Sequence, residues 1–260
     1  MKQPKLISGN NQSGFTIIEF LISSVGFTAV LLIMTFGIID FMVDYYKVTL
    51  SATVQTSATN ISTTIERSIE LSSSQSSVEF ISPSLVTVHA HDCPAGYLGT
   101  PPNCTEPGYF CTSTEEFSFF LGEEVPYDSS YALYQLPLPS SGCTPDPQYD
   151  SPASSSAWTD GRSLLGNNYR LINFNVQPVG SLPEETIILK IAYTSGGTNN
   201  TGDDLLCVPG QPASSPGSCS PGSPNLTDFT NSSIVCKGQK GQQFCAVAAL
   251  QSSVGFLISQ

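Results

Sequence analysis

Hydrophobic side chains are concentrated in one run near the N-terminus, from Phe15 to Ile39. The run has 25 residues, carries a single charge at Glu19, and contains only threonine and serine as other clearly polar residues. At a rise of about 1.5 Å per residue, a helix of this length crosses a hydrocarbon core of about 30 Å. The pattern therefore predicts a membrane-spanning helix over residues 15–39.

Apolar residues continue beyond this run at helical spacing and predict an amphipathic half of the same helix over residues 40–75. No proline occurs between Pro4 and Pro83, and a serine cluster at residues 72–77 ends the pattern. The apolar positions are Leu50, Val54, Ala58, Ile61, Ile65 and Ile69. Their spacings of four, four, three, four and four residues place them on one narrow face of a helix. We expect one continuous helix of about 55–60 residues.

Residues 76–260 are predicted to form a β-rich globular domain. Eight short runs are rich in β-branched or aromatic residues and are bounded by turn formers, which is typical of strands. They are Val78–Ile81, Leu85–Ala90, Glu116–Leu121, Tyr131–Leu136, Arg170–Val176, Thr186–Tyr193, Phe244–Leu250 and Val254–Ile258. Stretches rich in Pro, Gly and Ser predict surface loops at Gly99–Gly108, Pro137–Ser156 and Pro209–Pro224. An antiparallel sheet packed on the apolar face of the long helix gives an α+β fold.

Charged side chains on either side of the apolar run predict its orientation. Lys2 and Lys5 precede the run, whereas Asp40 and Asp44 follow it. Because basic flanks stay on the cytoplasmic side of a membrane, we expect the N-terminus in the cytoplasm and the C-terminal domain to be exported.

The eight cysteines all follow the apolar run and lie in polar, turn-rich sequence, at Cys93, Cys104, Cys111, Cys143, Cys207, Cys219, Cys236 and Cys245. An even count in such surroundings predicts disulfides in an oxidising compartment, with buried free thiols as the alternative. Zinc is disfavoured because the sequence has no C-x-x-C pair. Closeness in sequence favours two bridges, Cys236 with Cys245 and Cys207 with Cys219. The other four cysteines stay unassigned.

The composition excludes some classes of function. Nine Lys and Arg stand against 21 Asp and Glu, for a formal net charge of −12, and 12% of residues are charged. Nucleic-acid binding depends on basic side chains that neutralise phosphates, so general nucleic-acid binding is disfavoured.

Motifs for chemistry are weak. His89-Ala90-His91-Asp92 could bring two imidazoles to one face of a strand, but two histidines are too few for most hydrolytic metal centres. Gly202-Asp203-Asp204 offers oxygen ligands for calcium, although a solvated turn is the more ordinary interpretation. The sequence has no G-x-S-x-G elbow and no phosphate-binding glycine loop. We expect a protein that is not an enzyme, with no cofactor and no catalytic metal.

The junction between the short polar leader and the apolar run reads Gly14-Phe15-Thr16-Ile17-Ile18-Glu19. This string resembles the cleavage and methylation motif of type IV prepilins and type II secretion pseudopilins. The resemblance implies that residues 1–14 are a leader removed by a prepilin peptidase. It also implies N-methylation of Phe15, and a pilin-like fold in which residues 15–75 form the long helix.

Glu19 is informative because a carboxylate inside a membrane helix costs about 2.5–3.5 kcal/mol. The resemblance implies that Glu19 meets the free amino group of a neighbouring subunit during assembly. A glutamate tolerated near the membrane interface of a simple anchor is the alternative.

Two later segments, Gly202–Cys207 and Ile234–Gly238, look like those of the larger minor pilins of the PilW kind. That resemblance implies a subunit that helps to assemble or initiate a filament. Its partners would be other pilins and minor pilins, the prepilin peptidase, an inner-membrane assembly platform and membrane lipid. It would start in the bacterial inner membrane, with a single pass, and then enter a pilus or pseudopilus.

Three alternatives to this function remain open. One is a type II secretion pseudopilin, which gene neighbours would distinguish. A second is an exposed adhesion or DNA-uptake subunit whose loops bind a target. A third, an enzyme attached by a membrane anchor, has the least support from the sequence.

Overall fold

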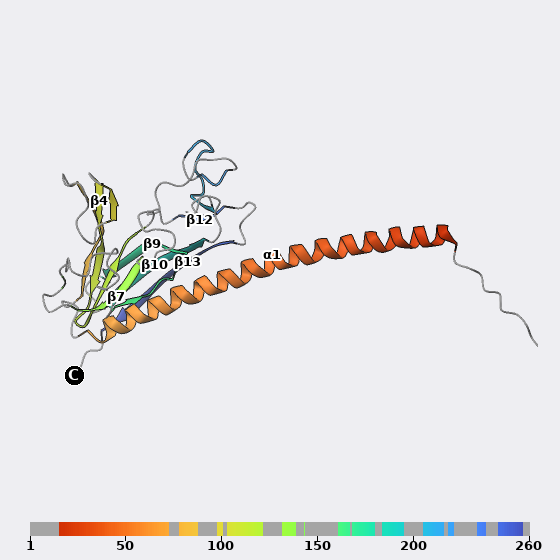
Figure 1. Ribbon diagram of the computed structural model, residues 1–260. Coiled ribbons are helices and arrows are strands. Elements are labelled where there is room, and N and C mark those ends of the chain that lie inside the picture. The colour runs from red at the N-terminus through yellow and green to blue at the C-terminus, as the bar shows by residue number, and fades with distance from the viewer. Residues whose placement is uncertain are drawn as a thin grey trace, which may run out of the picture. The chain divides into compact units, whose positions relative to one another are not determined.

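The computed structural model describes residues 16–72, 78–87, 98–100, 103–121, 132–138, 143, 161–166, 168–179, 184–194, 205–215, 218–220, 233–237 and 244–256. The chain divides into two compact units, Met1–Tyr45 and Tyr46–Gln260. One long helix begins in the first unit and ends in the second, and the strands lie in the second unit (Figure 1). The described elements form an α+β fold, as the sequence predicts.

Helix α1 (Ile17–Glu70) has 54 residues and is continuous, in agreement with the predicted single helix. Its last turn closes with the amide of Leu71 donating to the carbonyl of Arg67 and the amide of Ser72 donating to that of Ile69. The helix therefore ends at Glu70, earlier than the predicted bound at residue 75 and just before the serine cluster that the sequence identifies as a stop signal.

The predicted apolar face of the second half of α1 is buried. Val54, Ala58, Ile65 and Ile69 have no exposed surface, and Ile61 keeps 3%. Leu50 is partly buried against the same core. Burial of each large aliphatic side chain stabilises the fold by about 1.5–3 kcal/mol relative to exposure, so this face fixes how the helix packs.

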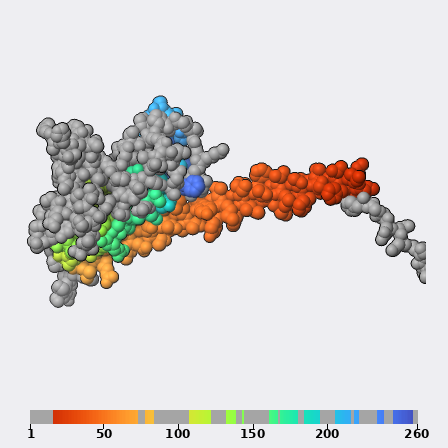
Figure 2. All heavy atoms as spheres, viewed as in Figure 1, coloured from red at the N-terminus to blue at the C-terminus, as the bar shows by residue number. Residues whose placement is uncertain are grey.

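A three-stranded antiparallel sheet packs on this face, with the order β13-β10-β9. Its strands are β9 (Tyr169–Pro178), β10 (Glu184–Thr194) and β13 (Cys245–Gly255). Figure 2 shows the green and cyan strands directly against the orange second half of the helix. Leu171 and Phe174 face the helical side, whereas Ile172 joins a separate small core on the opposite face. The sheet is thus buried along its helical face, and on the opposite face it is buried around Ile172.

One part of the strand prediction is wrong at the C-terminus. The runs Phe244–Leu250 and Val254–Ile258 are predicted as two strands, but β13 is continuous from Cys245 to Gly255. The polar residues between the runs remain in the strand because β13 pairs with β10 along its whole length. Ser252 also contacts the helix, with its hydroxyl 3.1 Å from the hydroxyl of Ser62.

A second antiparallel sheet has five strands in the order β1-β5-β6-β7-β8. The strands are β1 (Glu79–Ile81), β5 (Gly108–Cys111), β6 (Glu115–Phe119), β7 (Leu133–Pro137) and β8 (Arg162–Ser163). The sequence predicts β1, β6 and β7 closely but misses β5 and β8. Both are short, so their pairing with neighbours rather than their composition makes them strands.

The prediction of a surface loop at Gly99–Gly108 is also wrong. This stretch contains the end of β3 (Leu98–Thr100), all of β4 (Asn103–Glu106) and the start of β5. β4 pairs with β3 and with β2 (Ser84–Thr87) in a third sheet of order β2-β4-β3. Backbone pairing on both sides of β4 overrides the turn-forming composition that indicates a loop.

The centre of the main core is aromatic. The ring of Phe174 lies 4.9 Å from that of Phe119, 5.9 Å from Phe80 and 6.0 Å from Phe110, all edge-to-face. Such pairs stabilise by about 0.5–1.5 kcal/mol each beyond burial of their area. Gly108 allows this approach, because a Cβ atom there would overlap the ring of Phe119 and lie 2.7 Å from Cδ of Pro83. The core therefore ties β1, β5, β6 and β9 together.

Candidate functional site

The start of α1 is fixed by a reciprocal cap between Thr16 and Glu19. The amide and the hydroxyl of Thr16 donate to Oε2 of Glu19 over 2.9 and 3.0 Å, and the amide of Glu19 donates to the Thr16 hydroxyl over 3.3 Å. This arrangement is a capping box, which satisfies amide groups that have no partner within the helix. No described residue donates to Oε1 of Glu19, so one carboxylate oxygen stays available.

The first half of α1 exposes large apolar side chains all around its surface. α1 contains an 18-residue stretch that is long and apolar enough to cross a membrane, and none of that stretch is buried. The exposed side chains include Ile17, Ile18, Phe20, Leu21, Ile22, Val25, Phe27, Ile33, Met34, Phe36, Ile38 and Ile39. Exposure of this extent indicates a lipid or protein environment for the segment rather than water.

Three hydroxyl groups of this segment form hydrogen bonds within the helix. Ser24 donates to the carbonyl of Leu21 over 2.9 Å, Thr28 to that of Ser24 over 2.7 Å, and Thr35 to that of Leu31 over 2.8 Å. A polar group left without a partner in hydrocarbon is costly, and these bonds remove the cost. Glu19 is then the one ionisable side chain within the predicted span of residues 15–39.

The predicted cleavage and methylation residues, Gly14 and Phe15, lie outside the described residues. The same holds for His89, His91, Asp203 and Asp204. Among the residues that the structure does describe, no group of three or more His, Cys, Asp or Glu side chains could hold a metal ion.

Within the described part of the second unit, three disulfides join cysteines. Cys207 with Cys219 and Cys236 with Cys245 agree with the two bridges that the sequence favours, and Cys111 with Cys143 adds one that it left unassigned. The side chains of Cys93 and Cys104 lie outside the described part of the chain. Two bridges hold the strands β11 (Leu206–Cys207) and β12 (Val235–Cys236), which cover the face of the β9–β10–β13 sheet opposite the helix around Ile172 and Ala192.

Replacing Cys207 and Cys219 together by serine is expected to lower the free energy of unfolding by about 2–4 kcal/mol, because the bridge restricts the unfolded chain. Denaturant unfolding of the purified protein measures this change. Peptide mapping without reduction provides the control, and should recover Cys111 with Cys143, Cys207 with Cys219, and Cys236 with Cys245. Recovery of any other pairing among these six would contradict the structure.

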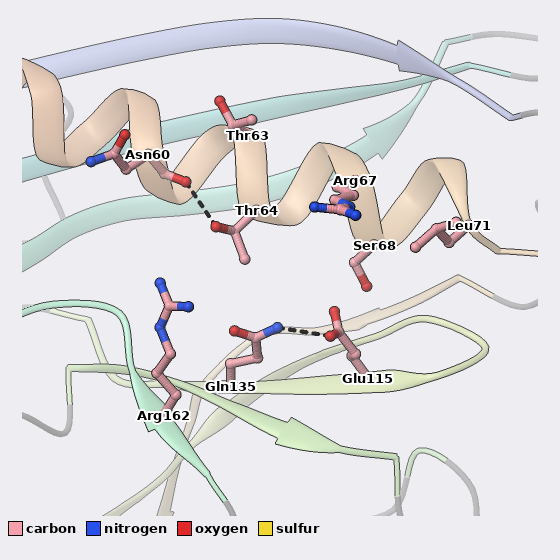
Figure 3. A pocket seen from close by; sticks show the side chains of 9 residues that line it. All are labelled: Asn60, Thr63, Thr64, Arg67, Ser68, Leu71, Glu115, Gln135 and Arg162. Carbon is pink, nitrogen blue, oxygen red and sulfur yellow. Dashed lines mark hydrogen bonds between the residues drawn. The ribbon is translucent and has the colours of Figure 1, made fainter.

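A polar hollow of about 550 Å³ lies in the second unit between α1 and the edge of the five-stranded sheet. We refer to it as the arginine groove. Figure 3 shows Glu115, Gln135 and Arg162 pointing from β6, β7 and β8 toward the helix. Nine residues line it: Asn60, Thr63, Thr64, Arg67, Ser68, Leu71, Glu115, Gln135 and Arg162.

Hydrogen bonds within the arginine groove hold its acidic side chain and one of its threonines in place. Nε2 of Gln135 donates to Oε1 of Glu115 over 2.8 Å, and the hydroxyl of Thr64 donates to the carbonyl of Asn60 over 2.9 Å. Arg67 and Arg162 are both exposed, and neither guanidinium has a hydrogen bond or ion pair with a described residue. The groove therefore presents two open donor groups beside one fixed carboxylate.

The chain was compared with protein-family models, with curated proteins and with solved structures, and nothing matches it.

Sequence reasoning missed two features of these sites. Thr16 and Glu19 form a T-x-x-E string at the start of an apolar run, which is a recognised capping signal and predicts the observed cap. The arginine groove had no such signal, because Arg67 and Arg162 are far apart in the chain and Arg162 lies outside every predicted strand.

Proposed function

We propose that this chain is a type IV pilin-like subunit, most like a minor pilin of the PilW kind, which acts by assembly and not by catalysis. One observation carries the proposal: an exposed apolar helix has a single carboxylate, Glu19, in its first turn, immediately after the Gly14-Phe15 junction. A simple membrane anchor needs no ionisable group at that place, and placing one there costs free energy.

The proposed mechanism begins with cleavage after Gly14. Cleavage creates a positively charged amino group on Phe15, at the start of an apolar helix. Thr16 engages Oε2 of Glu19 and leaves Oε1 open, so the carboxylate keeps an acceptor for the amino group of a neighbouring subunit. Pairing of these two charges would offset their cost in the membrane and would set the axial position of one subunit against the next.

The proposed location follows from the distribution of charge and cysteine. The N-terminus lies in the cytoplasm, residues 15–39 cross the bacterial inner membrane, and the disulfide-containing unit is exported to an oxidising compartment. Assembly would then move the subunit from the membrane into a pilus or pseudopilus. Its partners are other pilins, the prepilin peptidase and an inner-membrane assembly platform.

Mass spectrometry of the N-terminus tests this proposal. In cells that contain the prepilin peptidase, we expect a chain that starts at methylated Phe15 and lacks residues 1–14. In cells without the peptidase, we expect Met1 to be retained. A Gly14→Leu variant is the matched control, since it keeps the apolar helix but should block cleavage. An N-terminus at Met1 in the presence of the peptidase would refute the proposed processing.

A further inference from the structure

The arginine groove is the strongest candidate for a second binding site, and its charges are unusual for this chain. The whole chain has a net charge of −12, with only nine basic side chains. Two of those nine, Arg67 and Arg162, line one groove. They come from opposite walls, since Arg67 lies on α1 and Arg162 lies on β8.

A second hollow adjoins the arginine groove, so the site has room for a ligand larger than a single ion. A second hollow of about 290 Å³ shares Glu115, Gln135 and Arg162 with the arginine groove, and it continues past Leu136 and Pro137. Arg162 thus borders both hollows. Together the two hollows have the size of a ligand-binding cleft. Both are lined by residues of β6 and β7 and by Arg162 on the edge strand β8.

The lining chemistry favours a polypeptide with carboxylates over a phosphate polymer. Each guanidinium offers a planar set of donors that matches a carboxylate. Glu115, held by Gln135, adds an acceptor that suits peptide amides. Its negative charge opposes a phosphate at every position of a nucleic-acid chain more than it opposes a peptide, in which uncharged residues separate the carboxylates. Hydroxyl and amide groups of Asn60, Thr63 and Thr64 add further partners for a peptide backbone. The acidic surface elsewhere further disfavours nucleic acid.

We propose that the arginine groove binds an extended acidic segment of a neighbouring protein subunit, with its carboxylates on Arg67 and Arg162. This site lies wholly in the second unit and uses no residue of the membrane-spanning segment. Binding at this site is therefore independent of cleavage after Gly14. A failure of the cleavage test would not contradict this proposal.

Fluorescence anisotropy with the full-length chain in a neutral detergent tests this site. The probe is a labelled peptide with the sequence of residues 122–130, which carries three carboxylates and no basic side chain. We expect this peptide to bind, and an analogue with glutamine and asparagine in place of Glu and Asp to bind at least about tenfold more weakly. This comparison needs only the unchanged protein, so it does not depend on the folding of a variant.

Arginine variants locate the binding. We expect the double variant R67Q/R162Q to weaken the peptide's affinity at least about tenfold, and each single variant to give an intermediate loss. K237Q is the matched control, because it removes one positive charge outside the groove and should change affinity less than about twofold. Both arginines are exposed, so the variants should keep the circular dichroism spectrum of the original protein.

Four outcomes would overturn the proposal. The acidic peptide could fail to bind, or its amide analogue could bind equally well. R67Q/R162Q could bind as tightly as K237Q. Finally, inorganic phosphate or a single-stranded oligonucleotide could displace the peptide at lower concentration than unlabelled peptide does, which would make this a site for phosphates.

Discussion

Changing Glu19 to glutamine is expected to reduce incorporation of the subunit into filaments at least about tenfold. Glutamine can accept the same bonds from Thr16, so the capping box and the start of the helix should survive the change. The negative charge is lost, however. Two unit charges 4 Å apart attract by about 4 kcal/mol at an effective dielectric of 20, and each 1.4 kcal/mol is tenfold in an equilibrium.

The comparison of three variants separates the two roles of Glu19. Glu19→Ala removes both the charge and the cap, Glu19→Gln removes the charge alone, and Thr16→Ala weakens the cap alone. If charge pairing between subunits drives assembly, Glu19→Gln should be nearly as defective as Glu19→Ala, and Thr16→Ala should be the mildest.

The measurement is the amount of each variant in sheared filaments, normalised to its amount in membranes. Membrane levels serve as the control, because a variant that fails to insert or is degraded would also be missing from filaments. Normal incorporation of Glu19→Gln would show that Glu19 acts only as a helix cap. The assembly mechanism proposed above would then be wrong, even if cleavage after Gly14 occurs.

Changing Phe174 to alanine is expected to destabilise the second unit by about 3–5 kcal/mol. Phe174 is 2% exposed and its ring meets those of Phe80, Phe110 and Phe119. Removal of the Phe174 ring leaves a cavity beside the rings carried by β1, β5 and β6. This cavity cannot close unless the backbone moves. Since a domain is stable by only about 5–15 kcal/mol, this loss is a large part of the total.

Denaturant unfolding of the detergent-solubilised protein, followed by near-ultraviolet circular dichroism with the disulfides intact, measures this change. Phe244→Ala is the matched control, since that ring is 44% exposed and takes part in none of the ring contacts around Phe174. Its expected cost is below about 1 kcal/mol. Equal losses for the two variants would contradict the central position of Phe174 in the core.

Short-range patterns in the sequence determine much of this fold. The spacing of apolar residues predicts both the length of α1 and the face that is buried, because helical geometry repeats every few residues regardless of the rest of the chain. Two disulfides also follow from closeness in sequence, with separations of 12 and 9 residues. Cys111 and Cys143, separated by 32 residues, have no comparable local signal.

The candidate sites also differ in whether a local sequence signal predicts them. The residues that carry the proposed pairing between subunits lie within one short stretch, from Gly14 to Ile39, and could be recognised from residue types and order. The cap formed by Thr16 and Glu19 is also local, and its T-x-x-E string was available in the sequence. Only its geometry, with one oxygen of Glu19 engaged and the other open, required the structure.

The sequence by itself therefore determined the apolar helix, its buried stripe, the cleavage-like junction and the two short disulfide loops. The tertiary structure alone decided that β4, β5 and β8 are strands, and that Arg67 and Arg162 line the same groove. The physical reason is the range of the interactions. Helical periodicity and short loops act between neighbours in sequence, whereas strand pairing and groove formation join segments whose meeting depends on how the whole core packs.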